Sequence, residues 1–429
     1  MLTATTDRRE ASAPPDAGPD QRLLDMIAFG LSVFMLLVYS EAWVSPLLGD
    51  NTDEATSGLI RTLFFPAYAA SLALLALRPK QVLRVLVREP FLVAMIAIVI
   101  ASITWSVQPE QTQRRVVAIV FTTLGGVVLG ARWRWVQLLE VFAVTFGLLA
   151  VASLFVGLFV PSIGRMDTLF PGAWRGLWQE KNGFGGLMTF AILFFLPAAL
   201  LVPRRRLLWL ALAGLGLALL LLSQSKTSLV ALVLGVGALG LVSLAQRGGA
   251  LAVITVYCAV MGAAGLGFAI WQAPEVLLGL LGKDATLTGR TEIWAAVMTA
   301  IHKRPLLGYG YAAVWGETDP WGGPLAQIVR DAKFKPDHAH NSWLEQWLGM
   351  GLLGLTAWSL YYMTALCRAI WAVFTSRGAF VVFPFLLVFT LISLTESEVL
   401  IYNDLRWVMF VALLSRLALP ARESDERQA

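Results

Sequence analysis

Apolar runs close to the ~20 residues that a helix needs to cross a bilayer recur along almost the whole chain. Hydrophobic residues make up 57% of the 429 residues, and charged residues only 14%. The bilayer core offers no water to bond exposed backbone groups, so each run must satisfy its own N–H and C=O groups as a helix. The sequence therefore predicts an all-α integral membrane protein with about twelve transmembrane helices.

The short loops indicate how these helices are oriented, because Lys and Arg collect on the cytoplasmic side during insertion. Basic residues fall in alternate loops, which contain Arg78, Lys80, Arg84, Arg88, Arg132, Arg134, Arg204, Arg205 and Arg206. The first and last loops of the other set are acidic, with Glu41, Asp50, Glu396 and Glu398. Both termini are therefore expected inside, and the longest polar segment is expected outside.

This orientation divides the chain into five parts. They are a disordered cytoplasmic tail at residues 1–21, helices 1 to 9 at 22–271, a large periplasmic loop at 272–342, helices 10 to 12 at 343–419, and a second cytoplasmic tail at 420–429. The first tail lacks a basic start and a cleavage site, so the first helix is expected to remain uncleaved.

The net charge of +5 does not indicate a nucleic-acid partner. The basic residues are scattered over loops, where membrane topology explains them. The two cysteines, Cys258 and Cys367, offer neither a disulfide framework nor a metal site.

The large loop contains all three histidines of the chain, His302, His338 and His340. Apolar residues from 293 to 301 repeat at helical spacing after Thr288, a plausible cap, and this predicts an amphipathic helix on the membrane surface. Arg290 in its first turn has two interpretations: it binds a phosphate at the interface, or it is a solvated arginine paired with Glu292 or Asp284.

His340 is the candidate general base. Ser342 and Glu345 fit a capping box, which places His340 just outside a helix N-terminus, where the helix dipole favours the neutral imidazole. The alternative is a histidine that only hydrogen-bonds the turn. Asp337, His338 and His340 also suggest a metal site, but a third and fourth ligand would have to be the distant His302 or an unspecified acid.

Six cations in the short outer loops run against the insertion bias and therefore need a reason: Arg114, Arg115, Arg165, Arg175, Lys181 and Lys226. Solvation at a helix end is favoured for the first three, and the last three are the candidates for binding an anion. Arg175 and Lys181 lie in RGLWQEKNGFGG, where glycines let backbone amides approach a ligand, and Lys226 lies in SQSKTS at a helix start that favours an anion. Simple solvation at helix ends is the alternative. Gly349, Gly351 and Gly354 indicate close packing inside the membrane.

Four motifs in this order resemble one known family. GRTEIW with PLLGYG, then HAHNSWLEQWLGMGLLG, with RGLWQEKNGFGG and SQSKTS upstream, are similar to the O-antigen ligases and the O-antigen and exopolysaccharide polymerases of bacterial inner membranes. The similarity covers roughly residues 172–354. It implies the fold of type C glycosyltransferases, with the large periplasmic loop between helices 9 and 10.

The resemblance also implies residue roles. His340 takes the place of the family's general base, Arg290 and Lys226 take the places of the cations that hold pyrophosphate, and Arg175 and Lys181 extend this basic rim. Many relatives have Arg where Lys226 stands, so this chain keeps the charge but loses the planar grip on phosphate. His338, Asn341 and Tyr309 are possible accessory residues. No metal and no cofactor are implied.

The implied function is polymerisation of undecaprenyl-pyrophosphate-linked repeat units into exopolysaccharide or O-antigen on the periplasmic face of the inner membrane. Partners would be the lipid-linked glycan donor, a glycan or lipid A core acceptor, membrane lipids, and possible chain-length regulator and export proteins. A ligase that transfers the glycan to lipid A core is the first alternative. A lipid-linked oligosaccharide flippase or transporter is the second, but it would place polar residues at the bilayer midplane.

Overall fold

The structure is a computed structural model that describes residues 19–49, 54–167, 170–272, 290–315, 338–376 and 379–420. Within these ranges every regular element is a helix, apart from an isolated antiparallel bridge between Arg165 and Trp174. The all-α class is thus confirmed. Most of both expected tails, much of the large loop, and Asp284, Thr288 and Asp337 lie outside the described residues.

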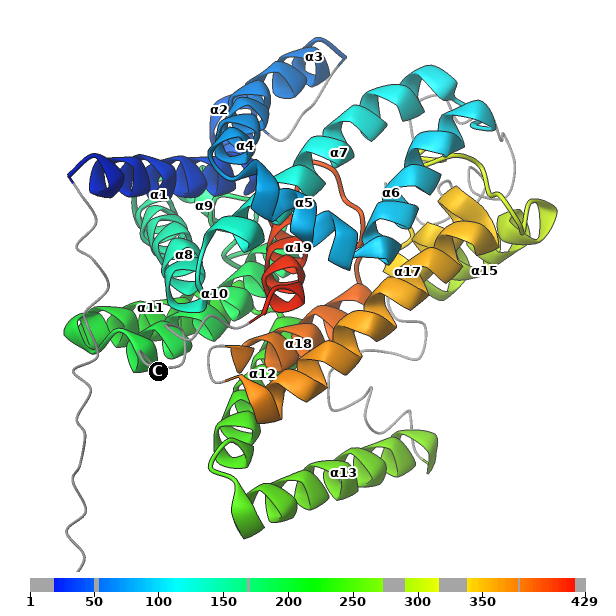
Figure 1. The fold of residues 1–429 in the computed structure, drawn as a ribbon. Helices are drawn as coiled ribbons and strands as arrows, with labels where there is room; N and C mark the ends of the chain where they lie inside the picture. The colour runs from blue at the N-terminus through cyan, green and yellow to red at the C-terminus, as the bar shows by residue number, and fades with distance from the viewer. Residues whose placement is uncertain are drawn as a thin grey trace, which may run out of the picture.

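The first half of the chain builds one side of the bundle (Figure 1). Its elements are α1 (Pro19–Tyr39), α2 (Val44–Leu48), α3 (Glu54–Leu63), α4 (Phe65–Leu77), α5 (Pro79–Arg88), α6 (Pro90–Ala101), η1 (Ser102–Thr104), α7 (Pro109–Arg132), α8 (Trp135–Phe159) and α9 (Pro161–Gly164). Helix α1 begins at Pro19, two residues before the expected end of the tail at residue 21.

The second half contributes the remaining elements. They are α10 (Lys181–Leu201), η2 (Pro203–Arg205), α11 (Arg206–Ser223), α12 (Lys226–Ala245), α13 (Gly249–Gln272), α15 (Arg290–Lys303), α17 (Ser342–Thr375), α18 (Val382–Ser393) and α19 (Leu405–Ala418). Helix α19 passes through the middle of the bundle beside α7, while α12 and α13 form a hairpin at its edge (Figure 1).

The described helices include eight that are long and apolar enough to span a membrane, or nine if a bent pair counts as one span. That pair, α5 followed by α6 and η1, turns by 90° at Glu89 and Pro90. Helix α18 has only 12 residues and α19 only 14, which is short for a full crossing. The structure therefore does not confirm the expected count of about twelve.

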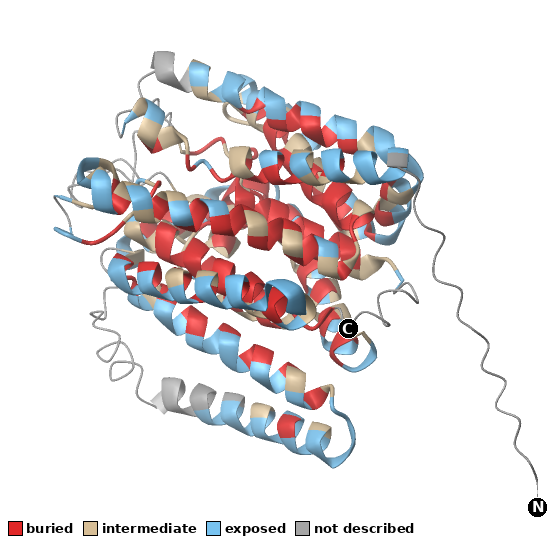
Figure 2. Cartoon of the chain, turned by 90° about the vertical axis from the view of Figure 1, so that its left-hand side faces the viewer, coloured by how far each residue is buried: buried red, intermediate tan, exposed pale blue. Residues whose placement is uncertain are grey.

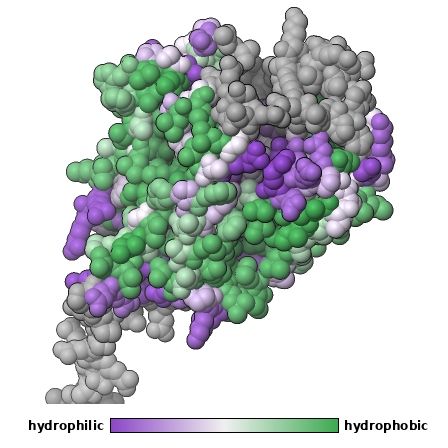
Figure 3. All heavy atoms as spheres, turned by 90° about the horizontal axis from the view of Figure 1, so that it is seen from above, coloured by the Kyte–Doolittle hydropathy of each residue, from purple (hydrophilic) through white to green (hydrophobic). Residues whose placement is uncertain are grey.

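The outside of the bundle is apolar, which is the reverse of a soluble protein. Large apolar side chains are exposed on many helices, including Leu207 at 83%, Val87 at 73% and Val253 at 70%, while buried residues fill the interior (Figure 2). In Figure 3 this apolar surface lies between groups of hydrophilic residues. The chain is a multi-pass membrane protein.

Helix α17 is broken near the end that carries the histidine loop. Gly351 has φ +65° and ψ −165°, so the chain leaves the helical path there. The PLLGYG segment, residues 305–310, lies in the break: Leu352 N–H donates to Pro305 O at 2.8 Å and Gly310 N–H to Gly349 O at 2.8 Å. A Cβ on Gly351 would collide with the backbone of Leu306. The break gives the first turns of α17 their own direction.

Helix α15 packs on the protein through its apolar face. Ile293, Val297 and Ile301 are each no more than 1% exposed and form a small core with Tyr309 and Leu348. This apolar face is covered by α17 and the PLLGYG segment, so it packs on protein and not on lipid. The expected position of the helix at the membrane surface stays a prediction. Helix α15 is thereby fixed beside the histidines.

Candidate active site

The HAH segment is held by its central residue. Ala339 is fully buried, its N–H donates to Glu345 Oε2 at 2.9 Å, and its carbonyl accepts from Trp294 Nε1 at 2.9 Å. Trp294 belongs to the GRTEIW motif on α15, so this motif anchors the histidine segment. His338 and His340 are therefore displayed from a fixed backbone.

The cap of α17 is Asn341, one residue before the expected one. Its Oδ1 accepts from the N–H groups of Trp343 at 3.0 Å and Leu344 at 3.2 Å. The predicted capping box of Ser342 and Glu345 is wrong, because both side chains bind other loops. His340 nevertheless lies just outside the helix N-terminus, as expected.

The backbone of His340 is in the left-handed region, with φ +49°. Such a conformation is uncommon for residues other than glycine and is often found at functional sites. Its N–H donates to Nδ1 of His338 at 3.1 Å, and the two rings meet edge to face at 4.1 Å between centroids. This turn aims the imidazole of His340 at the loop between α18 and α19.

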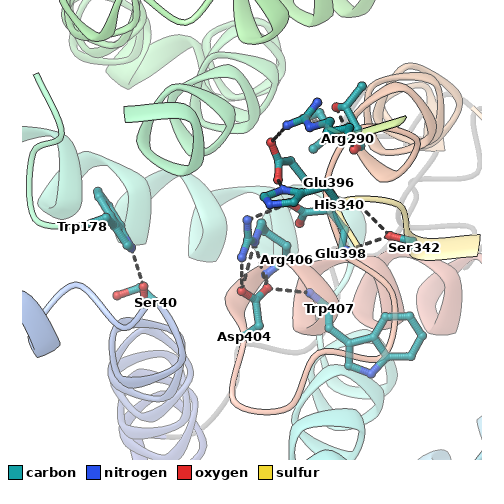
Figure 4. Close-up of polar contacts among 12 residues, drawn as sticks. Ser40, Trp178, Arg290, His340, Ser342, Glu396, Glu398, Asp404, Arg406 and Trp407 are labelled. Carbon is teal, nitrogen blue, oxygen red and sulfur yellow. Dashed lines mark hydrogen bonds and ion pairs between the residues drawn. The ribbon is translucent and has the colours of Figure 1, made fainter. Parts of the chain in front are cut away.

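Glu396 in that loop joins the two candidate catalytic residues (Figure 4). Its Oε2 lies 2.8 Å from His340 Nδ1, and its Oε1 lies 2.6 Å from Arg290 Nη2. The three side chains are 23%, 17% and 13% exposed, respectively. Among the described residues the acidic partner of Arg290 is thus Glu396 from a distant loop and not Glu292; Asp284 lies outside the described residues.

We call Glu396, His340 and Arg290 the triad; the negative charge of Glu396 offsets the positive charge of Arg290. Burial by itself would raise the pKa of Glu396, but the hydrogen bond from His340 and the charge of Arg290 outweigh it and hold the pKa below its ordinary value of 4.5. Glu396 is therefore ionised at neutral pH. If Nδ1 of His340 carries a proton toward this carboxylate, Nε2 is left as the proton acceptor.

A network of polar side chains behind Glu396 holds the loop that contains it. Ser342 Oγ donates to Glu396 O at 3.0 Å and accepts from Glu398 N–H at 2.7 Å, which ties the loop to the start of α17. Arg406 then bonds both Glu398, at 2.7 Å, and Asp404, at 2.6 Å (Figure 4). Burial raises the pKa of Glu398, while the charge of Arg406 acts in the opposite direction.

The start of α10 and the start of α12 lie side by side and bring two lysines together. Gly185 makes this approach possible: a Cβ there would lie 2.9 Å from side-chain atoms of Ser223, Ser225 and Ser228. Lys181 and Lys226 are the first residues of the two helices, close enough for their charges to act on each other. Cations are unfavourable at helix N-termini unless an anion is present.

A pocket connects these helix starts with the triad. Its walls are Asn182, Gly183, Gly186, Phe190, Ser225, Thr227, Ser228, Ile392, Thr395, Glu396, Glu398 and Arg406. One wall thus comes from residues next to Lys181 and Lys226, and the opposite wall contains the carboxylate that holds His340 and Arg290. None of Lys181, Lys226, Arg290 and His340 lines the pocket itself: the two lysines are next in sequence to lining residues, and Arg290 and His340 contact the lining residue Glu396.

The other candidates are placed differently. Arg175 donates to the carbonyls of Ile163 at 2.8 Å and Ser162 at 3.1 Å, so it fastens its own loop to α9. Tyr309 is 1% exposed and its hydroxyl donates to Ala300 O at 2.7 Å, which joins PLLGYG to α15. His302 is on α15 with its Nδ1 2.7 Å from Met298 O, and Asn341 is the cap described above.

A metal ion would find three ligands here. His338, His340 and Glu396 offer atoms within 4.8 Å of one another, so the acid that the sequence left unspecified is Glu396. Carboxylate and imidazole suit zinc, which keeps an open position when it has three protein ligands. Two contacts compete with metal binding. Nδ1 of His338 already accepts a hydrogen bond from the N–H of His340, and Arg290 already neutralises Glu396.

Glu396 is the residue that sequence reasoning missed as part of the site. It was seen only as an outer-loop acid, 56 residues from His340 and 106 from Arg290. The available signal was its neighbourhood: Glu396, Glu398, Asp404 and Arg406 are charged residues between two apolar helices, and Glu398 is only 1% exposed. Charges in such a place need a functional or structural reason.

The fold and this pocket define a polytopic helical membrane protein with a charged site at one end of its bundle. Residues 210–359 match the model of a family described as O-antigen ligase. This part of the chain is similar to that family, in agreement with the resemblance of its motifs. It contains Lys226, Arg290 and His340 and ends before Glu396.

A curated relative adds to this match. The exopolysaccharide production protein ExoQ of Rhizobium meliloti is 31% identical over 210 residues, which are 44% of this chain and 45% of the relative. The alignment thus spans less than half the length of that relative. The relative is named for exopolysaccharide production, whereas the family is described as O-antigen ligase.

Proposed function

We propose that this chain is a glycosyltransferase that polymerises undecaprenyl-pyrophosphate-linked repeat units on the periplasmic face of the bacterial inner membrane. The observation that carries the proposal is the position of Glu396, which contacts both His340 and Arg290 and lines the pocket beside Lys226. The family match and the relative's link to exopolysaccharide production support the substrate class.

The reaction divides between the two walls of the pocket. An acceptor hydroxyl attacks C1 of the donor sugar, and Nε2 of His340 takes the hydroxyl proton while the bond from C1 to the pyrophosphate oxygen breaks. Glu396 orients the imidazole and stabilises the imidazolium that forms. The pyrophosphate leaves with the bonding electron pair and its charge is met by cations.

Lys226, Lys181 and Arg290 are the cations for the leaving group. The free N–H groups at the starts of α10 and α12 add partial positive charge, so the two helices and their lysines act on the same anion. Arg290 keeps further N–H donors beyond the one that binds Glu396. Because Glu396 neutralises Arg290, the net positive charge for the pyrophosphate would come from Lys181, Lys226 and the two helix N-termini.

The acceptor decides between polymerase and ligase. Purified protein in proteoliposomes is supplied with a labelled lipid-linked repeat unit, either alone or together with lipid A core. Growth of the label into a ladder with the donor alone is the expected result. Label that moves only when lipid A core is present would make the protein a ligase, and label that crosses the bilayer without a new glycosidic bond would make it a transporter.

A further inference from the structure

A second cavity, of about 210 Å³, lies among the arginines of α5, α7 and α19. Its described lining includes five arginines, Arg84, Arg88, Arg132, Arg134 and Arg416, together with Trp133. None of the described lining residues is a carboxylate. The described lining therefore concentrates positive charge in one cavity.

This cavity is at the opposite end of the bundle from the triad. Helix α7 begins beside Tyr311, whose carbonyl accepts from Thr112 at 3.1 Å, and ends at Arg132 in the cavity. Its 24 residues span ~36 Å at 1.5 Å per residue. Helix α19 likewise begins beside Glu398 and carries Arg416 in its last turn. Along α19, Arg406 at the first pocket and Arg416 at the second cavity are ten residues, or ~15 Å, apart.

Insertion bias alone does not explain the arrangement. That bias requires Arg in the inner loops, where the side chain can reach water. Here the side chain of Arg132 is only 5% exposed. Arg132 pairs with Asp25 at 2.8 Å, yet its buried Nε has no hydrogen-bond partner within the described residues. Guanidinium groups buried near like charges are costly unless an anion accompanies them.

The surroundings match the depth of lipid headgroups. Trp133 lines the cavity and Trp135 lies under Arg416, with the guanidinium carbon 5.5 Å from the ring centroid. Tryptophan is enriched where the bilayer meets water. Arg88 donates to Ala418 O at 3.0 Å, which caps α19 and uses only part of its guanidinium.

We infer that this cavity binds the phosphate of an anionic phospholipid headgroup. Guanidinium forks match phosphate oxygens in pairs, and basic pockets between membrane helices at this depth suit such headgroups. The bound phosphate supplies the negative charge that the lining lacks. The lipid thereby locks the ends of α5, α7 and α19 together. This inference does not depend on the proposed transferase activity.

Lipid retention measured by native mass spectrometry tests the inference. The full chain is purified in neutral detergent, and phosphatidylglycerol, phosphatidylcholine or inorganic phosphate is added separately. We expect retention of phosphatidylglycerol over phosphatidylcholine. In an Arg84→Gln/Arg134→Gln double variant we expect about tenfold weaker retention of phosphatidylglycerol.

A matched control removes the same charge from the same end of the bundle. Arg204 and Arg206 are exposed, lie at the end of α10 opposite the triad, and do not line the cavity. An Arg204→Gln/Arg206→Gln variant should retain phosphatidylglycerol like the wild type. If both variants lost phosphatidylglycerol equally, the effect would come from net charge and not from the cavity, and the inference would be overturned.

Two further results would also overturn it. One is saturation of the cavity by inorganic phosphate at the concentration at which the lipid binds, which would assign the site to free phosphate. The other is retention of phosphatidylglycerol unchanged in the Arg84→Gln/Arg134→Gln variant. Thermal unfolding in phosphatidylcholine shows whether that variant is folded, and we expect a midpoint close to that of the wild type.

Discussion

The two ends of the bundle both gather arginines, but they balance them differently. At the triad end, Arg290 pairs with Glu396 and Arg406 pairs with Glu398 and Asp404. At the other end, five arginines surround a cavity whose described lining contains no carboxylate. The first end can hold a charge-balanced catalytic group and pass a proton through it. The second end is the proposed site for an anion from outside the chain, in addition to Asp25, which pairs with Arg132.

The largest effect is expected at His340. His340→Ala should lower the rate of chain growth by ~10²–10⁴-fold, because the acceptor hydroxyl loses its base. The measurement is polysaccharide formation in membranes that contain equal amounts of inserted protein. His302→Ala is the matched control, since this histidine of the same loop contacts its own helix at Met298 O. Wild-type growth in the His340 variant would contradict the assignment.

Glu396→Gln is expected to have the next largest effect. The amide keeps the size of the side chain but cannot neutralise Arg290 or stabilise the imidazolium, so we expect turnover to fall about 100-fold. Expressed protein should still insert. A variant with a nearly normal rate would show that the carboxylate only shapes the loop, and the charge balance at this end would then have no catalytic meaning.

The lysines at the helix starts should have a smaller effect. Lys181→Ala and Lys226→Ala each remove one charge near the leaving group, and we expect about a tenfold loss in kcat/KM for each. Lys226→Arg should keep most of the activity, because it restores a cation with more donors. Lys303→Ala, at the end of α15, is the control for charge. Losses no larger than that of Lys303→Ala would remove the lysines from the site.

The smallest effect concerns acid stability. Because the pKa of Glu396 is depressed in the fold, its stabilisation is complete above the unfolded value near 4.5 and is lost as pH falls through the folded pKa. The difference in unfolding midpoint between the wild type and Glu396→Gln should therefore be constant near neutrality and shrink only below pH ~4. Disappearance of the difference already at pH 6 would contradict the depressed pKa.

The residues of the proposed site are easier to predict from the sequence than their partners. Local features point to Lys226 as a charge on the wrong side of the membrane, to Arg290 as a cation in the first turn of an amphipathic helix, and to His340 as a histidine before a helix start. Glu396 was missed because hydrogen bonds between residues 56 and 106 positions apart leave no local pattern. The capping box was wrong because Asn341 competes for the same backbone N–H groups.

The fold class followed from hydropathy, whereas the number of spans did not. Apolar runs predict helices, but they do not show that α5 turns 90° into α6 or that α18 has only 12 residues. Gly351 was expected to allow close packing of one helix on another. Instead it breaks α17, and the PLLGYG segment packs into the break. Such features depend on tertiary contacts that a window of sequence does not contain.

Release of undecaprenyl pyrophosphate by purified protein after exhaustive chelation tests the central claim most directly. The claim is that the imidazole of His340, held by Glu396, acts as the base while cations alone meet the departing pyrophosphate. We expect the chelated wild type to keep its full rate and chelated His340→Ala to lose it. A wild type that stops on chelation and recovers with a divalent ion would instead make His338, His340 and Glu396 metal ligands.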